Sequence, residues 1–217
     1  MKIYAVADIH GKPEYIQQIH DEISQNKPDV LIIAGDITHY FDSRKAIKQL
    51  KDIKIPVFAI RGNWDFKVVE NIIRRQANMQ LLTPTPVDHE TLNLIGFNGT
   101  FFLPFLSKIC IMEKRLINFA APLITKDTIV VAHPPPRGIL DQVAGKYSAG
   151  SFGLKKLIQT HSPLMVLCGH IHEQSGYQYY KNTLVVNCAM NKTCGGAIIE
   201  YDKAVTGRKL TVNMITT

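Results

Sequence analysis

The sequence lacks any apolar run that approaches the roughly 20 residues needed to span a membrane. It contains no repeat, low-complexity tract or linker, and its first residues, Met1 to Tyr4, lead directly into a strand-like stretch instead of a signal peptide. A chain of 217 residues is long enough to bury one core without disulfides. We therefore expect one cytoplasmic domain over residues 1–217, with no membrane contact.

Cysteine is scarce, and the four cysteines show no C-x-x-C spacing. They lie on apolar or turn-like segments, which is typical of reduced, structural thiols. We assign no chemistry to Cys110, Cys168, Cys188 or Cys194.

Acidic residues are outnumbered, because 18 Asp and Glu stand against 25 Lys and Arg and leave a net charge of +7. A positive field favours encounters with phosphates and other anions. The basic residues are scattered, however, with only short pairs such as Arg74-Arg75. A solvated basic surface is therefore favoured over a dedicated nucleic-acid face.

Short β-branched runs alternate with amphipathic stretches in the first third of the chain, which is typical of β-α-β units and a parallel sheet. The predicted strands there and beyond are 3–7, 30–34, 57–60, 92–97, 128–132 and 164–167, and the predicted helices are 13–25, 43–51, 66–77, 108–121 and 153–160. The last third of the chain is predicted to form four antiparallel strands, 177–180, 184–187, 197–201 and 210–214. The aromatic stretch 101–105 is expected to line a cleft or to contact another subunit.

Polar residues follow five of the predicted strands at the point where each strand ends. The segments are Asp8-Ile9-His10, Gly35-Asp36, Gly62-Asn63, His133 and Gly169-His170-Ile171-His172. In an open α/β sheet, ligands bind beyond the carboxyl ends of the strands, so these residues should meet although they are far apart in sequence. Any one segment alone is more typical of a turn with a surface histidine. The ordered set of five is what indicates a metal.

The chemistry of these side chains indicates which metals would suit them. Two aspartates and four histidines gathered without a cation would leave partly buried charges uncompensated. Carboxylate oxygens, imidazole nitrogens and an amide oxygen suit Mn, Fe, Zn, Co or Ni. The seven candidate ligands exceed what one tetrahedral ion uses. Two divalent ions that share a bridging carboxylate would accommodate them.

In this order the segments resemble the D-x-H, G-D, G-N-H-D/E, H and G-H-x-H pattern of the calcineurin-like metallophosphoesterase superfamily, over about residues 2–200. The resemblance implies an α/β fold in four layers, an α/β/β/α sandwich of two mixed sheets flanked by helices. It implies a first metal held by Asp8, His10, Asp36 and His172, and a second held by Asp36, Asn63, His133 and His170, with Asp36 as the bridge. The implied nucleophile is a hydroxide that bridges the two ions.

The segment Gly62-Asn63-Trp64-Asp65 departs from that pattern, because Trp64 replaces a histidine that assists phosphoryl transfer in most of the superfamily. An indole N–H donates a hydrogen bond but does not release a proton at ordinary pH. One interpretation is that His39 supplies the missing function. A second is that the leaving group needs little protonation and Trp64 offers a flat surface to a base or aryl ring. A third is that catalysis is lost and the fold is a binding scaffold.

Several other residues are weaker candidates. For Trp64, the alternative to substrate contact is that it packs under a loop. Asp65 is expected to orient a neighbouring ligand or to cap the helix that starts at residue 66. Arg61 and Arg137 are candidates for contact with a substrate anion, with a surface position as the alternative for each. Ser151 is expected to be a helix N-cap.

We predict a phosphoester hydrolase that uses two divalent ions, with Mn favoured and with Asp36, Asn63 and His39 as catalytic residues. Trp64 and Arg137 are the predicted substrate contacts. A phosphodiester is favoured over a monoester, and a nucleotide is one candidate substrate. The alternatives are a protein-binding scaffold and a nuclease, the latter less favoured because the chain lacks room for a large capping domain. The sequence does not specify an oligomeric state.

Overall fold

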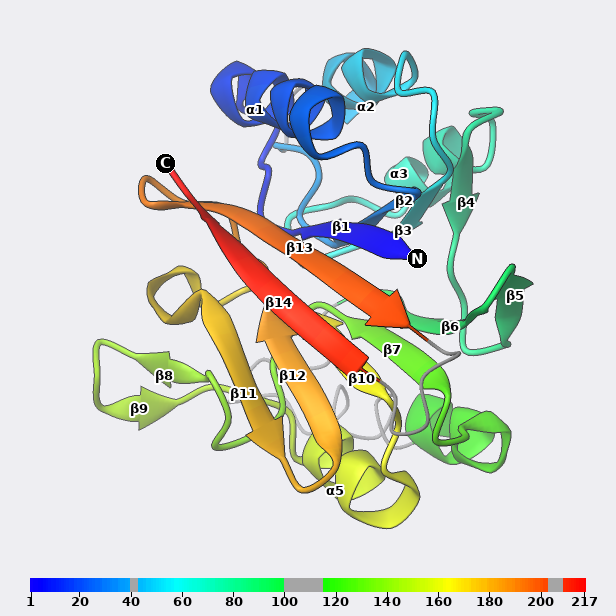
Figure 1. Cartoon of the computed structure of the whole chain (residues 1–217), viewed down its shortest axis with the longest axis vertical. Helices are drawn as coiled ribbons and strands as arrows, with labels where there is room; N and C mark the ends of the chain where they lie inside the picture. The colour runs from blue at the N-terminus through cyan, green and yellow to red at the C-terminus, as the bar shows by residue number, and fades with distance from the viewer. Residues whose placement is uncertain (40–42, 100–114, 203–208) are drawn as a thin grey trace.

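The computed structural model of the chain describes residues 1–39, 43–99, 115–202 and 209–217. Two six-stranded sheets form its centre (Figure 1). The first sheet has the strand order β14-β13-β1-β2-β3-β4, and the second has the order β11-β12-β10-β7-β6-β5. Parallel and antiparallel pairs occur in both, so both sheets are mixed.

The strands of the first sheet are β1 (Lys2–Val6), β2 (Val30–Ala34), β3 (Val57–Ile60), β4 (Met79–Leu81), β13 (Cys194–Asp202) and β14 (Lys209–Thr216). The strands of the second sheet are β5 (Val87–His89), β6 (Leu92–Phe97), β7 (Thr128–Ala132), β10 (Met165–Cys168), β11 (Gly176–Tyr180) and β12 (Thr183–Asn187). A separate hairpin pairs β8 (Gln142–Val143) with β9 (Tyr147–Ser148). The helices are α1 (Pro13–Asn26), α2 (Ser43–Leu50), α3 (Val68–Ile73) and α5 (Phe152–His161), with 3-10 turns η1 (Ala121–Leu123) and η2 (His172–Gln174).

Helices cover the outer face of each sheet. Ile19 of α1, Ile47 of α2 and Val69 of α3 pack in one buried cluster with side chains of the first sheet. Leu154 of α5 and Ile117, from the helical residues 115–120, pack in another cluster with the second sheet. The layers therefore run α/β/β/α, which confirms the predicted fold.

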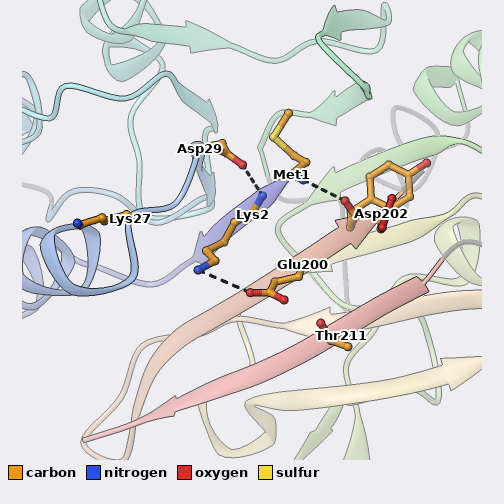
Figure 2. Close-up of a pocket in the computed structure, with 8 residues that line it drawn as sticks. Met1, Lys2, Lys27, Asp29, Glu200, Asp202 and Thr211 are labelled. Atoms are coloured by element: carbon orange, nitrogen blue, oxygen red, sulfur yellow. Dashed lines mark hydrogen bonds and ion pairs between the residues drawn. The ribbon is translucent and has the colours of Figure 1, made fainter. Parts of the chain in front are cut away.

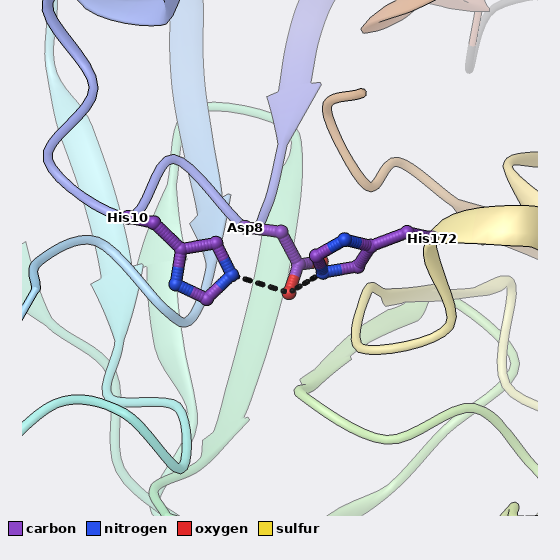
Figure 3. Close-up of side chains that lie close together, drawn as sticks. All are labelled: Asp8, His10 and His172. Atoms are coloured by element: carbon purple, nitrogen blue, oxygen red, sulfur yellow. Dashed lines mark ion pairs between the residues drawn. The ribbon is translucent and has the colours of Figure 1, made fainter. Parts of the chain in front are cut away.

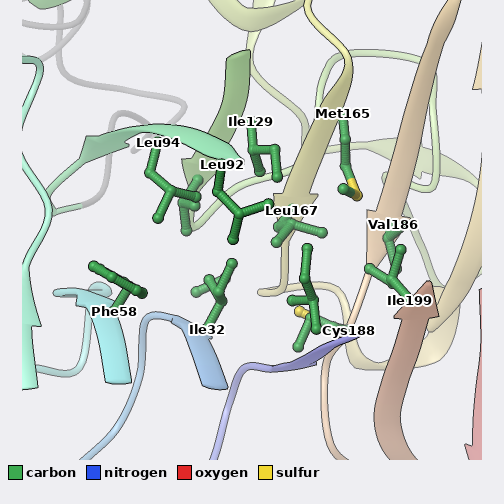
Figure 4. Close-up of a cluster of buried hydrophobic side chains, with 14 of the residues drawn as sticks. Ile32, Phe58, Leu92, Leu94, Ile129, Met165, Leu167, Val186, Cys188 and Ile199 are labelled. Carbon is green, nitrogen blue, oxygen red and sulfur yellow. The ribbon is translucent and has the colours of Figure 1, made fainter. Parts of the chain in front are cut away.

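A third apolar cluster fills the space between the sheets (Figure 4). Ile32 and Phe58 of the first sheet face Leu94, Ile129 and Leu167 of the second, and all five are at most 3% exposed. Burying each such side chain contributes about 1.5–3 kcal/mol. This inner layer holds the carboxyl ends of β1, β2 and β3 against those of β7 and β10.

Most predicted elements are present, and the differences have identifiable causes. The limits of β2, β3, β6 and β7 equal the predicted ones. β2 and β3 are unbroken apolar runs buried on both faces, and β6 and β7 are mostly apolar, with Asn93 and Thr128 as their polar residues. The prediction that 184–187 is antiparallel is wrong in part, because β12 pairs parallel to β10 and antiparallel only to β11. The strands β4, β5, β8 and β9 are absent from the prediction, since each has only two or three residues.

Three predictions concern residues outside those described. The aromatic stretch 101–105 and the thiol of Cys110 lie there entirely, and so does the first part of the predicted helix 108–121, of which residues 115–120 are helical. Within the described ranges, no helix has both the length and the apolar character needed to cross a bilayer.

Candidate metal centre

The predicted ligands come from the ends of strands in both sheets. Asp8 follows β1 and Asp36 lies just beyond β2, whereas His133 follows β7 and His170 lies just beyond β10. The backbone N–H of His170 donates to Oδ2 of Asp8 at 2.8 Å and so connects the two sheets directly. The carboxyl ends of the strands therefore form one site.

Asp8 lies at the centre of the side-chain cluster. Its Oδ1 is 3.1 Å from Nε2 of His172 and 3.8 Å from Nε2 of His10, and the two rings point at this oxygen from either side (Figure 3). The same oxygen is 3.9 Å from Nε2 of His133. Asp36 completes the cluster, because its Oδ2 lies 3.3 Å from Nε2 of His133 and 3.9 Å from Nε2 of His10.

Two groups of side chains in this cluster could each hold a cation. They are Asp8, His10 and His172, and Asp8, Asp36 and His133, and the ligand atoms within each group lie within 4.8 Å of one another. Asp8 belongs to both groups, whereas the resemblance implies Asp36 as the bridge. The other two predicted ligands contact each other, since Nδ1 of His170 is 3.0 Å from Oδ1 of Asn63. The ring of His170 also lies 5.1 Å from that of His133.

Two buried atoms of the cluster fit a metal in particular. Asp8 Oδ1 and His133 Nε2 form no hydrogen bond with any residue that the structure describes. Their contacts are the ion pairs of the cluster, with Oδ1 of Asp8 3.1 Å from Nε2 of His172 and Nε2 of His133 3.3 Å from Oδ2 of Asp36. Nδ1 of His133 donates to the carbonyl oxygen of Ala34 at 2.8 Å, and this bond directs Nε2 into the cluster. A carboxylate oxygen and an imidazole nitrogen that face a common space are suitable ligands for a divalent cation.

The backbone around the cluster adopts unusual conformations. Asp8, His10, Asp36 and His170 have φ angles of 60°, 50°, 52° and 71°. Residues other than glycine in this left-handed region are uncommon and concentrate at functional sites. Gly62 is required for a different reason, because a Cβ there would overlap Oδ1 and the backbone nitrogen of Asp36. The two loops after β2 and β3 therefore approach more closely than any larger residue would allow.

Asp65 fastens these two loops together. It is 2% exposed, and its carboxylate accepts hydrogen bonds from the N–H of Ile37 at 3.1 Å, the N–H of Gly62 at 3.0 Å, and the N–H and hydroxyl of Thr38 at 2.9 and 2.8 Å. The alternative that Asp65 caps a helix is wrong, because α3 begins at Val68 and has no side-chain cap. Its role as an orienting residue beside the ligands agrees with these contacts.

A pocket of about 530 Å³ opens over the cluster, and Trp64 and His39 are among the residues that line it. The N–H of Trp64 donates to Oδ1 of Asp36 at 2.8 Å. Its indole meets the ring of His10 edge-to-face, with centroids 5.8 Å apart, and stacks on His39, with centroids 6.0 Å apart and planes at 28°. His39, the candidate proton donor, and Trp64, the candidate stacking surface, therefore contact each other.

A sequence model of calcineurin-like phosphoesterases matches residues 1–174. The chain belongs to this family. The phosphoesterase is accordingly a metal-dependent hydrolase of phosphoester bonds, from a family with a dinuclear divalent metal centre, and its Asp and His groups are able to bind metal. It is 27% identical over 198 residues to an uncharacterised protein of Methanocaldococcus jannaschii, an alignment that covers 86% of this chain and 87% of that protein.

Several solved structures share the fold of the phosphoesterase. A protein of Thermus thermophilus has a TM-score of 0.72 and 17% identity, covering 98% of both chains. A dimetal phosphatase from Danio rerio has a TM-score of 0.66 and 9% identity, covering 99% of this chain and 95% of its own. An archaeal phosphodiesterase has a TM-score of 0.55 and 15% identity, covering 98% of this chain and 100% of its own. At these identities the likeness establishes the fold alone.

The histidines of the metal-free phosphoesterase differ in charge. Burial lowers the pKa of His133, but the carboxylates of Asp36 and Asp8 outweigh burial and raise that pKa to about 9. Burial and the neighbouring His133 together lower the pKa of His170 to about 4. Near neutral pH, His133 is therefore protonated and His170 is neutral.

This charge distribution predicts how metal binding depends on pH. A protonated imidazole does not bind a cation, so an ion at His133 must displace a proton whenever the pH is below about 9. We expect the affinity for Mn²⁺ to rise at least about tenfold per pH unit near neutral pH and to level off above about 9, because His172, whose pKa is also raised, adds to the proton displaced from His133. Calorimetric titration in buffers of different ionisation enthalpy measures both the affinity and the released proton. An affinity that stays constant over this range would contradict a ligand role for His133.

The two candidate arginines contact other parts of the chain. Nε of Arg61 is 2.9 Å from Oε1 of Glu70. The guanidinium of Arg137 donates to the carbonyl oxygen of Ser148 and lies 4.8 Å from the ring centre of Phe152. Neither arginine is among the residues that line the pocket over the cluster. Substrate contact by Arg137 therefore stays a prediction, and it would have to occur outside that pocket.

Ser151 has the predicted role of N-cap, because its hydroxyl accepts the N–H of Leu154 at 2.9 Å at the start of α5. Cys168, Cys188 and Cys194 are free and buried, as expected of structural thiols.

A second pocket, of about 660 Å³, lies at the other end of β1 (Figure 2). Lys2 contacts two of its acidic residues: the backbone N–H of Lys2 donates to Asp29 at 2.6 Å, and Nζ of Lys2 is 3.6 Å from Glu200. Ligands of α/β sheets bind at the carboxyl ends of the strands, and this pocket lies at the amino end. We assign it no chemistry.

Proposed function

We propose that this phosphoesterase cleaves phosphodiesters with two divalent ions, of which Mn²⁺ is the favoured one. The first ion would be held by Asp8, His10, Asp36 and His172, and the second by Asp36, Asn63, His133 and His170, with Asp36 between them. The observation that supports this most strongly is the pair of buried atoms, Asp8 Oδ1 and His133 Nε2, that form no hydrogen bond with the described residues.

Two bound ions would lower the pKa of the attacking water and neutralise charge on the phosphoryl oxygens. Both carboxylates, of Asp8 and Asp36, are oriented by a backbone N–H group. Oδ1 of Asp36 accepts the N–H of Trp64, and Oδ2 of Asp8 accepts the N–H of His170, each at 2.8 Å. Each carboxylate is thus fixed through one oxygen and presents its other oxygen to the cluster.

His39 is the residue we propose for protonating the oxygen of the leaving group. It is exposed, lines the same pocket as Asp36, and stacks on Trp64. Trp64, which stands where the family pattern has histidine, does not release a proton. The diester preference follows from this difference and is in keeping with the archaeal phosphodiesterase that has the same fold.

Replacement of His39 tests its role through the leaving group. We expect His39→Ala to lower turnover of a dinucleoside monophosphate about a hundredfold, because its leaving alkoxide needs a proton. Bis(p-nitrophenyl) phosphate has a good leaving group that requires little protonation, so its turnover should change less than about threefold. The comparison uses steady-state rates at equal metal content, with His161→Ala as the control. Equal losses on both substrates would argue against proton donation by His39.

The proposed function is tested with metal-stripped protein and bis(p-nitrophenyl) phosphate. Turnover that appears on adding Mn²⁺ and exceeds turnover of p-nitrophenyl phosphate would support a diester hydrolase. Bound metal without turnover with Mn, Co, Ni or Zn would favour the binding scaffold. Cleavage of single-stranded DNA in preference to small diesters would favour the nuclease.

A further inference from the structure

We propose that Trp64, Val143 and Ile171 form a subsite for a flat aromatic group of the substrate, either a nucleobase or an aryl ring. All three residues line the pocket that opens over Asp8 and Asp36. The proposal rests on the proposed hydrolase function and names the class of substrate, an aromatic phosphoester. A phosphoryl group at the metal cluster would leave its aromatic substituent beside Trp64.

The position of Trp64 is fixed by its backbone. Its N–H donates to Oδ1 of Asp36 at 2.8 Å, and the next residue, Asp65, is fastened by the hydrogen bonds from Ile37, Thr38 and Gly62. The backbone that carries the indole therefore cannot move away from the cluster without breaking these hydrogen bonds. Because Trp64 lines the same pocket as Asp8 and Asp36, a substrate bound at the metal centre would lie beside the indole.

The orientation of the indole is fixed by two other rings. His10 meets it edge-to-face at 86°, and His39 stacks on it at 28°. Aromatic pairs in these geometries are favourable, so the indole is held in place before any substrate arrives. Prior fixation lowers the entropy that a ligand must lose on binding.

The rest of the subsite is apolar. Val143 belongs to the β8–β9 hairpin, and Ile171 stands between the two histidines that follow β10. Trp64 is 37% exposed, although a tryptophan that only packed under a loop would be buried. Apolar walls and an indole suit a flat ring that stacks. Lys12 and Glu173 line the same pocket and are able to contact polar groups of the substrate.

The experiment uses the fact that Trp64 is the single tryptophan of the chain. Fluorescence excited at wavelengths selective for tryptophan then reports on this residue alone. The phosphoesterase is loaded with Zn²⁺ and titrated with adenosine 5′-monophosphate and, separately, with ribose 5-phosphate. Both probes carry the same phosphate and sugar, and only the first carries a base. We expect saturable quenching by the first and about tenfold tighter binding of it than of the second.

Variants separate stacking from packing. Calorimetry measures both probes with Trp64→Phe, which keeps a flat ring, and with Trp64→Leu, which keeps apolar volume without one. We expect Trp64→Phe to retain most of the preference for the base and Trp64→Leu to reduce it to less than about twofold. Phe66→Leu is the matched control, because Phe66 is 52% exposed and does not line the pocket. It should leave the preference unchanged.

The outcomes distinguish this proposal from the proposed function. Quenching with a base preference that Trp64→Leu removes supports the subsite, even if no diester is hydrolysed. Metal-dependent turnover of diesters with equal binding of the two probes overturns the subsite and leaves the hydrolase intact. A base preference that survives in Trp64→Leu also overturns the subsite.

Discussion

Replacing Asp36 with asparagine is expected to lower metal-dependent turnover at least about a thousandfold, which corresponds to about 4 kcal/mol of transition-state stabilisation. Asp36 is 1% exposed, and its Oδ2 lies 3.3 Å from His133 and 3.9 Å from His10. The amide removes the negative charge of the carboxylate that we propose to lie between the two cations. Oδ1 can still accept the N–H of Trp64, so the loop should keep its shape.

Two further measurements distinguish a lost ligand from a lost fold. Circular dichroism and thermal unfolding of Asp36→Asn should match the parent protein, while the stoichiometry of bound Mn²⁺ falls. The pKa of His133 should also fall, because the Asp36 carboxylate is the largest contribution that raises it. Asp52→Asn makes the same chemical change on an exposed residue and should alter nothing. Full activity in Asp36→Asn would remove the basis for a bridging role.

Replacing Asp65 with alanine is expected to destabilise the metal-free protein by about 4 kcal/mol, because four buried donors would lose their acceptor. Burial raises the pKa of Asp65, so its carboxylate is costly to bury and depends on those donors. For a chain of this size the loss corresponds to a fall in melting temperature of roughly 8–16 °C. Thermal unfolding of the metal-free protein measures it.

A second substitution shows whether the acceptors are what matters. Asp65→Asn keeps one acceptor oxygen but turns an NH₂ group toward donors such as the N–H of Ile37, so it should also destabilise. Asp52→Ala removes an exposed carboxylate and should change the melting temperature little. If Asp65→Ala melts with the parent protein, the four hydrogen bonds do not fasten the two loops.

The sequence is most informative where burial is complete. Continuous apolar runs predict the limits of β2 and β3, because strands buried on both faces need no polar residues. The limits of β6 and β7 are also predicted, although these strands include Asn93 and Thr128. The predicted helix after Asp65, from 66 to 77, is too long, since α3 spans only Val68–Ile73. Its periodic pattern includes Phe66, which is 52% exposed. The pairing of β12 with β10 is a non-local choice that the local pattern of residues 184–187 does not encode.

For the site, the sequence predicts which residues meet but not all of the contacts among them. The strand-end rule identifies the residues that meet, because it depends only on strands being parallel. Sequence reasoning misses the subsite contribution of Val143 and the four hydrogen bonds of Asp65, which depend on how separate loops approach one another. The glycine at Gly62 is a usable signal, since a glycine before a ligand indicates close backbone approach.

The candidate ligands are divided between two sheets that pack against each other through the apolar layer of Figure 4. Asp8 and Asp36 belong to one sheet and His133 and His170 to the other. A refolding chain that has formed either sheet alone therefore has only part of the candidate coordination set. High-affinity metal binding should appear only when the sheets dock. The rate at which metal binding appears during refolding therefore measures the docking step, separately from the formation of secondary structure.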